Sequence, residues 1–178
     1  MEFSLFESTA TDEVVELFTR VFSASEGAAE GQSIGFLVSS LITTTPADSL
    51  IGCVAKDGTR IVGAIFFSRL KVPSGQRAFL LSPVAVATEV HGTGIGQALI
   101  TFGLDQLRSQ GTDLVFTYGD PAFYSKTGFA QIDESIVAAP YPLSQPIGWL
   151  GQSLDGSPIP AMRGVTECVE AFANPDHW

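Results

Sequence analysis

Apolar residues near the start of the chain recur every three or four positions, the spacing that lines one face of a helix. This pattern predicts helices over residues 12–24 and 31–43. Thr11 is a favourable N-cap for the first helix because its side chain can accept a hydrogen bond from a free backbone N–H. The segment between the helices, residues 23–33, is small, polar and acidic, and we expect it to be a mobile connection.

The pattern then changes to runs rich in Val, Ile and Phe, which are typical of strands. Strands are expected near residues 3–5 and over residues 50–55, 60–72 and 77–87. Asp57-Gly58 and the segment 73–76 supply turn residues between the last three runs. Three consecutive strands joined by tight turns predict an antiparallel meander.

A helical pattern returns at residues 94–110 and is followed by a buried strand at 114–118. Because a helix separates this strand from the one at 77–87, the two strands are expected to be parallel. Asp120 as N-cap and Pro121 at the first helical position predict a short helix over residues 121–127. Further strands are expected at 129–132, 147–154 and 164–169, and residues 1–178 are predicted to form a single domain.

Residues 80–97 connect the end of an apolar strand to the first turn of a helix. Gly92, Gly94 and Gly96 alternate with other residues in this connection. A glycine-rich turn before a helix leaves backbone N–H groups free, and the helix dipole adds partial positive charge. Residues without side chains also let a ligand approach the backbone and can adopt positive φ. This stretch therefore predicts a site for the pyrophosphate of a nucleotide-type cofactor.

Composition restricts the classes of protein to which the chain could belong. A formal net charge of −10 disfavours binding to nucleic acid, while 45% hydrophobic residues are enough for a substantial core. Cys53 and Cys168 lie far apart in apolar contexts and are expected to be free thiols, and no spacing of Cys and His predicts a metal site. We find no signal peptide and no run of the ~18 apolar residues needed to span a membrane, so a soluble cytoplasmic protein is expected.

Two segments resemble the GNAT superfamily of acetyl-CoA-dependent N-acetyltransferases. Residues 91–96 fall on the family's cofactor loop, Gln/Arg-x-x-Gly-x-Gly/Ala. Residues 121–129, PAFYSKTGF, are similar to its helix-then-strand segment, with Tyr124 four residues before Gly128 and Phe129. The resemblance implies an α/β (α+β) fold with a mixed, mostly antiparallel twisted sheet flanked by helices. A central pair of parallel strands would splay apart to hold CoA.

The resemblance also implies roles for individual residues. Backbone groups of Val84, Ala85 and Val86 would bind the pantetheine arm, with an amide near Val86 facing the thioester carbonyl. The pyrophosphate would lie on His91, Gly92, Thr93, Gly94, Ile95 and Gly96. Tyr124 is the candidate general acid, although an aromatic residue that only packs a short helix would produce the same pattern.

Two residues depart from the family's pattern, and several questions stay open. His91 replaces Gln or Arg, and Asp120 stands near a position where many members have Asn. No general base can be assigned among Glu26, Glu30, Glu89 and His91. Asp120 fits a helix cap better than a base, and a water relay is an open alternative. The acceptor is expected to be an amine of a small molecule or a protein, and the oligomeric state is open, a homodimer included.

Two other functions are compatible with a glycine-rich loop. One is a non-catalytic module that binds acyl-CoA as a sensor. The other is a dinucleotide or nucleoside-triphosphate site. The second is disfavoured because the glycines do not follow the Rossmann spacing Gly-x-Gly-x-x-Gly and no Gly-Lys-Ser/Thr is present.

Overall fold

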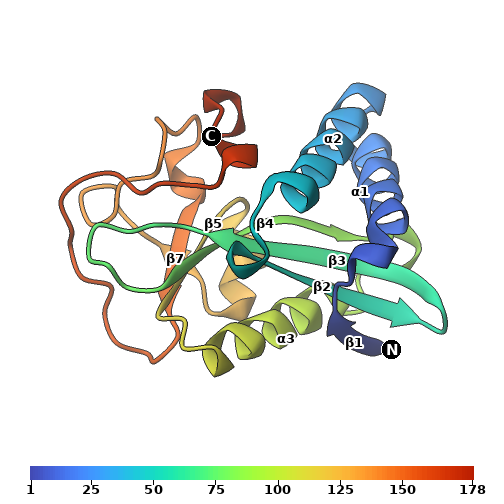
Figure 1. Cartoon of the computed structure of the whole chain (residues 1–178), viewed down its shortest axis with the longest axis horizontal. Coiled ribbons are helices and arrows are strands. Elements are labelled where there is room, and N and C mark those ends of the chain that lie inside the picture. The colour runs from blue at the N-terminus through green and yellow to red at the C-terminus, as the bar shows by residue number, and fades with distance from the viewer. The chain divides into compact units, whose positions relative to one another are not determined.

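The computed structural model describes residues 1–178 as a mixed α/β fold (Figure 1). One sheet contains seven strands in the order β1-β2-β3-β4-β5-β7-β6. The strands are β1 (Glu2–Leu5), β2 (Leu50–Asp57), β3 (Arg60–Arg69), β4 (Ala78–Val86), β5 (Leu114–Tyr118), β6 (Ala130–Gln131) and β7 (Trp149–Ser153). The helices are α1 (Thr11–Glu26), α2 (Ala28–Thr44), α3 (Ile95–Ser109) and α4 (Pro121–Tyr124). Strands β4 and β5 are parallel, whereas the pairs β1–β2, β5–β7 and β6–β7 are antiparallel, so the predicted fold class is confirmed.

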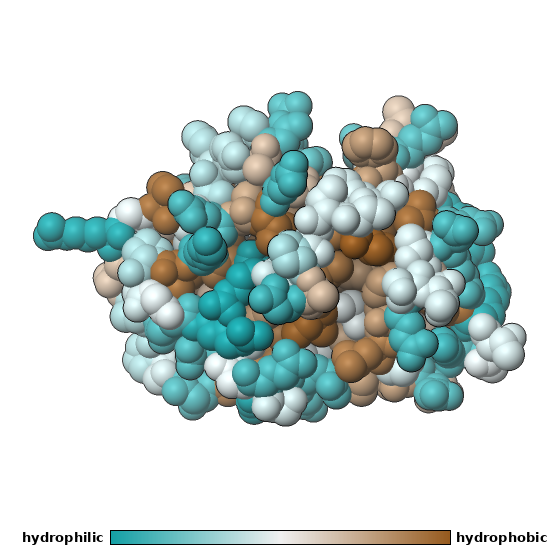
Figure 2. Space-filling view, viewed as in Figure 1, coloured by the Kyte–Doolittle hydropathy of each residue, from teal (hydrophilic) through white to brown (hydrophobic).

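The chain divides into two compact units. Unit 1 consists of Met1–Phe66 and Pro83–Gly103, and unit 2 of Phe67–Ser82 and Leu104–Trp178. The single domain expected from the sequence stays a prediction. Polar residues cover much of the face seen in Figure 2, and apolar residues show in patches between them.

Helices α1 and α2 of unit 1 form a tight antiparallel pair, and the predicted mobile connection over residues 23–33 is wrong. Both helices extend into that segment, and only Gly27, with φ of 99°, separates them. Ala and Glu in the segment are good helix formers, which its polar composition concealed. Gly31 allows the close approach, because a Cβ on Gly31 would lie 2.6 Å from the carbonyl oxygen of Thr19.

Strand β3 lies between helices within unit 1. Phe66 packs against Phe18 of α1, with ring centroids 6.2 Å apart. A Cβ on Gly63 would lie 3.3 Å from the Leu99 side chain of α3. Gly63 and Phe66 are three positions apart. Because successive side chains alternate between the two faces of a strand, these two positions point to opposite faces. Therefore α1 covers one face of β3, and the first turns of α3 cover the other.

The core of unit 2 is aromatic. Strand β7 pairs antiparallel with both β5 and β6. Trp149 of β7 is fully buried and stacks on Phe116 of β5, with centroids 5.3 Å apart. The indole of Trp178 packs against Trp149, and its N–H donates to the carbonyl of Phe172 at 3.0 Å. Such aromatic contacts hold the loop-rich C-terminal segment on the sheet.

Several element boundaries differ from the prediction. Ala10, the last residue of a 3-10 turn, is the N-cap of α1, and the Thr11 hydroxyl instead donates to the carbonyl of Ser8. The strand expected over residues 60–72 ends at Arg69. No strand forms over residues 164–169, where only isolated bridges join Lys71 to Glu167 and Ala138 to Val165. No helix is long and apolar enough to cross a lipid bilayer.

Candidate functional site

The glycine-rich connection in unit 1 turns at two glycines that have positive φ. A short 3-10 turn, Thr88–Val90, follows β4, and α3 begins at Ile95. Gly92 and Gly94 have φ of 76° and 82°, which side-chain-bearing residues rarely adopt. A Cβ on either glycine would meet no atom within 4 Å, so open space adjoins both. Gly96 already lies inside the helix.

The backbone N–H groups of this loop are available to a ligand. Those of Gly92, Thr93 and Gly94 donate no backbone hydrogen bond within unit 1. The first bond of α3 runs from Ala98 to the carbonyl of Gly94 at 3.0 Å, so the N–H groups of the first helical turn have no partner in the helix. Together with the helix dipole, these donors form a site suited to an anion.

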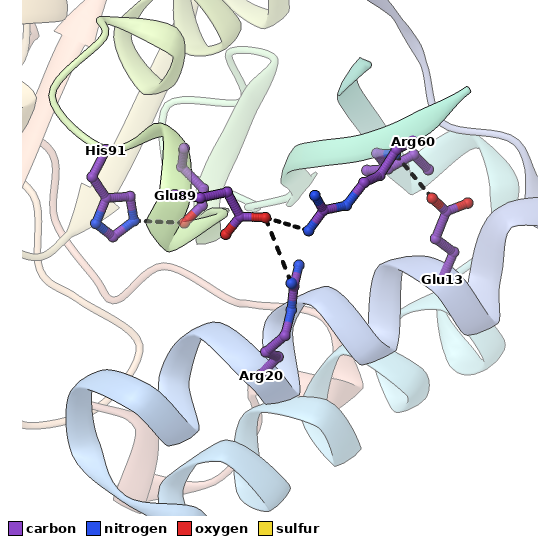
Figure 3. A network of polar contacts seen from close by, with 7 residues as sticks. Glu13, Arg20, Arg60, Glu89 and His91 are labelled. Atoms are coloured by element: carbon purple, nitrogen blue, oxygen red, sulfur yellow. Dashed lines mark hydrogen bonds and ion pairs between the residues drawn. The ribbon is translucent and has the colours of Figure 1, made fainter. Parts of the chain in front are cut away.

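An ion-pair network anchors the turn that precedes the loop (Figure 3). The carboxylate of Glu89 pairs with Arg60 of β3 and lies 3.7 Å from the guanidinium of Arg20 on α1. The pKa of Glu89 is lowered by its backbone hydrogen bond and further by the two arginines. A carboxylate held in this way is a poor general base, so Glu89 is a weak candidate for that role.

The end of β4 exposes backbone groups on the side away from β3. The N–H of Ala87 donates to the carbonyl of Val62 on β3 at 2.7 Å. Because backbone groups alternate in direction along a strand, those of Val84 and Val86 point away from β3. Nε2 of His91 lies 2.6 Å from the carbonyl oxygen of Val86; because a carbonyl can only accept, Nε2 is the donor in this hydrogen bond. His91 thus connects the loop to the end of β4.

In unit 2, the parallel pairing of β4 and β5 is short. It joins residues 78–81 to residues 114–117 and stops there, although β4 continues to Val86. At the last pair, the hydroxyl of Thr117 donates to the carbonyl of Leu81 at 2.8 Å. Both residues are buried, so this bond satisfies the carbonyl where the strand pairing ends.

Tyr124 ends α4 and is held by close contacts. Its ring packs edge-on against Phe123 and Phe129, with centroids 5.0 and 5.9 Å away. Burial raises the pKa of Tyr124 to about 12, and the negative charge of Asp120 acts in the same direction. The phenol therefore keeps its proton through the neutral range.

The remaining candidates have simpler surroundings. Asp120 caps α4 as predicted, its carboxylate accepting from the N–H of Ala122 at 2.9 Å. Glu26 and Glu30 are exposed at the end of α1 and in the first turn of α2. No group of three or more His, Cys, Asp or Glu side chains is placed to hold a metal ion.

The structure brings the predicted residues together in two groups. In unit 1, the end of β4 and the glycine loop are adjacent and joined through His91. In unit 2, Tyr124 lies in the short helix that Asp120 caps, and its N–H donates to the carbonyl of Asp120 at 3.1 Å. The bond from Thr117 to Leu81 was missed in the sequence, where its only signal is a hydroxyl within the otherwise apolar start of the strand LVFTY.

Comparison with known proteins gives consistent matches. A family model described as acetyltransferase (GNAT) domain matches residues 48–131. The chain is 30% identical over 122 residues to YhbS of Escherichia coli K12, an uncharacterized N-acetyltransferase, and the match covers 67% of this chain and 71% of YhbS. It is 29% identical over 174 residues to YjhQ of the same strain, also an uncharacterized N-acetyltransferase, covering 94% of this chain and 92% of YjhQ.

A solved structure has the same fold over nearly the full chain. The crystal structure of Escherichia coli YhbS in complex with CoA matches with a TM-score of 0.79 and 26% identity, covering 97% of this chain and 92% of that one. A GNAT-family acetyltransferase of Brucella melitensis in complex with acetyl-CoA matches in fold, with a TM-score of 0.74 and 22% identity over 96% of this chain and 97% of that one.

Proposed function

The chain belongs to the GNAT superfamily of N-acetyltransferases, and we propose that it transfers the acetyl group of acetyl-CoA to a primary amine by direct attack. The observation that carries this proposal is the set of unpartnered N–H groups in the loop after β4. The similar YhbS and Brucella melitensis structures contain CoA and acetyl-CoA respectively, which supports acetyl-CoA as the donor. The acceptor is an amine of a small molecule or a protein.

The residues of unit 1 fit a CoA-type donor. Its diphosphate would accept hydrogen bonds from the N–H groups of residues 92–96, where no Cβ of Gly92 or Gly94 obstructs the approach. The pantetheine arm carries amides, which pair with the outward backbone groups of Val84 and Val86. The thioester oxygen can only accept a hydrogen bond, so the Val86 N–H is the group that can face it, while the Val86 carbonyl accepts from His91.

The reaction needs a neutral amine and a proton for the leaving sulfur. The amine nitrogen attacks the thioester carbon, a C–N bond forms, the C–S bond breaks, and one amine proton must leave. Tyr124 is the proposed donor to the sulfur, because its raised pKa keeps the phenol protonated. A thiol, with an ordinary pKa of about 8.5, is the stronger acid. Complete proton transfer from the phenol to the sulfur is therefore unfavourable in free energy. The proton released by the amine then restores the protonated phenol.

Donor binding is tested first. A thermal-shift assay with acetyl-CoA and with CoA should raise the melting temperature, because a ligand that binds only the folded state stabilises it. No shift with either compound would contradict the proposal.

Turnover is tested with a panel of amines. Acetyl-CoA plus an acceptor should release CoA, measured with a thiol reagent, and yield the acetylated amine by mass spectrometry. Tyr124→Phe should lower this rate about a hundredfold without losing donor binding. Binding without CoA release across small-molecule and peptide amines would favour a sensor over an enzyme.

A further inference from the structure

The peptide group between Val86 and Ala87, at the end of β4, is held on both sides. Its N–H donates to the carbonyl of Val62 on β3 at 2.7 Å, and its carbonyl accepts from Nε2 of His91 at 2.6 Å. The N–H and C=O of a trans peptide point in opposite directions. The first bond therefore ties this peptide to the sheet, and the second ties it to the glycine-rich loop.

The side chain of Thr93 makes a similar bond inside the loop. Its hydroxyl donates to the carbonyl of Val90 at 2.6 Å. The backbone of the preceding turn already satisfies the carbonyls of Ala87 and Thr88, which accept N–H groups at 3.0 and 3.2 Å. Thr93 thus supplies a donor to a carbonyl that the backbone of the turn leaves free.

Carbonyl and N–H groups are treated differently along this connection. The carbonyls that accept a hydrogen bond within unit 1 are those of Val86, Ala87, Thr88 and Val90. The N–H groups of residues 92–94 donate none. A carbonyl oxygen carries partial negative charge and repels a phosphate, whereas a free N–H attracts one. Engaging these carbonyls while the amides stay free suits the loop to an anion.

Neither side chain has a proton left for a phosphate. A threonine hydroxyl carries one proton, and that of Thr93 goes to the carbonyl of Val90. A neutral imidazole carries one N–H, and that of His91 is on Nε2 and goes to Val86. The donors that remain for an anion in this part of the loop are backbone amides.

We infer that His91 and Thr93 are positioning residues of the donor site. Their side chains hold the carbonyls of Val86 and Val90, and this keeps the amides of the loop directed at the diphosphate. The amides bind the anion, and the two side chains act through them. The identity of the anion rests on the proposed function, whereas the two side-chain bonds do not.

The protonated nitrogen of His91 can be observed directly. In a ¹⁵N-labelled protein, long-range ¹H–¹⁵N spectra distinguish a proton on Nε2 from one on Nδ1. His177 is the only other histidine, so His91→Gln identifies the signals that belong to His91. A neutral ring with its proton on Nε2, both without and with CoA, is expected. A proton on Nδ1 in the ligand-free protein would overturn the role of His91.

Paired variants test the positioning in the ligand-free protein. Thr93→Val keeps the shape but removes the hydroxyl, and His91→Phe keeps a ring without a donor. Both should lower the backbone order parameters of Gly92 and Gly94, because a held carbonyl is released. The matched controls Thr93→Ser and His91→Gln each keep a side-chain donor and should retain this order.

CoA affinity supplies the second readout. Losing one exposed hydrogen bond should raise the dissociation constant of CoA about three- to tenfold in Thr93→Val and His91→Phe, and not in the controls. Weaker CoA binding with unchanged order in the ligand-free loop would show that these side chains contact the phosphates themselves, which would overturn the inference. If the unaltered protein binds no CoA, the proposed function fails, and the ligand-free order parameters still decide the positioning role.

Discussion

Glycine at position 94 can be required for its positive φ or because a side chain would keep a ligand from the backbone. Substituting Gly94, with a second glycine of similar φ as control, distinguishes these two requirements. Gly94→Ala places a Cβ on a residue with φ of 82° in the loop before α3. The control, Gly75→Ala, does the same at φ of 77° in the turn after β3, and neither Cβ would meet an atom within 4 Å. Each variant should lose about 1–2 kcal/mol of stability from backbone strain alone.

The two variants should differ in CoA binding. A methyl group at Gly94 keeps the diphosphate away from at least one N–H donor, and a hydrogen bond to a charged group contributes about 1.5–3 kcal/mol. The dissociation constant of CoA should therefore rise by about ten- to a hundredfold in Gly94→Ala. Gly75→Ala should bind CoA like the unaltered protein.

Isothermal titration calorimetry measures the affinities, and thermal unfolding measures the strain. A chain of this size should lose about 2–8 °C in melting temperature in either variant. Equal CoA affinity in all three proteins would refute the assignment of the diphosphate to this loop. Equal loss of affinity in both variants would show that general destabilisation, and not the lost donor, weakens binding.

Three further predictions follow from other contacts. Because burial raises the folded-state pKa of Tyr124 to about 12, its contribution to stability should persist below the unfolded value of about 10 and disappear as pH rises through 12; Tyr124→Phe should flatten this part of a denaturation-versus-pH curve. Glu89→Gln should reduce the melting temperature at low salt but not at high salt, since its partners are exposed. Gly31→Ala should destabilise the chain by about 1–3 kcal/mol in urea denaturation despite the better helix propensity of Ala, because its Cβ would overlap the Thr19 carbonyl; an increase in stability would contradict the packing of α1 on α2.

Local signals in the sequence predicted much of the fold. Positive φ at Gly92 and Gly94, the Asp120 cap and the bounds of β5 are each determined by residues close in sequence. The segment around Gly27 was wrongly predicted to be a mobile connection, because its polar residues are compatible with both a loop and the ends of two helices. Packing decides between them, and Gly31 against Thr19 is a contact that no periodicity reveals.

The candidate site was less predictable than the fold. Glu89 appeared as a potential base, and only the proximity of Arg20 and Arg60 shows it to be an ion-pair partner. The close approach of the Tyr124 ring to Gly119 is a tertiary contact, which neighbouring residues in the sequence do not reveal. Backbone groups carry most of the proposed donor site, so side-chain identity alone could mark the loop but not the bond from His91 to Val86.

Amide chemical shifts during a CoA titration report directly on whether the loop before α3 binds the diphosphate. In a ¹⁵N-labelled protein, the N–H signals of Gly92, Gly94 and Gly96 should show large, saturable shifts with CoA. Dephospho-CoA, which retains the diphosphate, should shift the same signals, and pantetheine, which lacks it, should leave them nearly unchanged. Binding of CoA that leaves these three amides unperturbed, or no binding, would contradict the account.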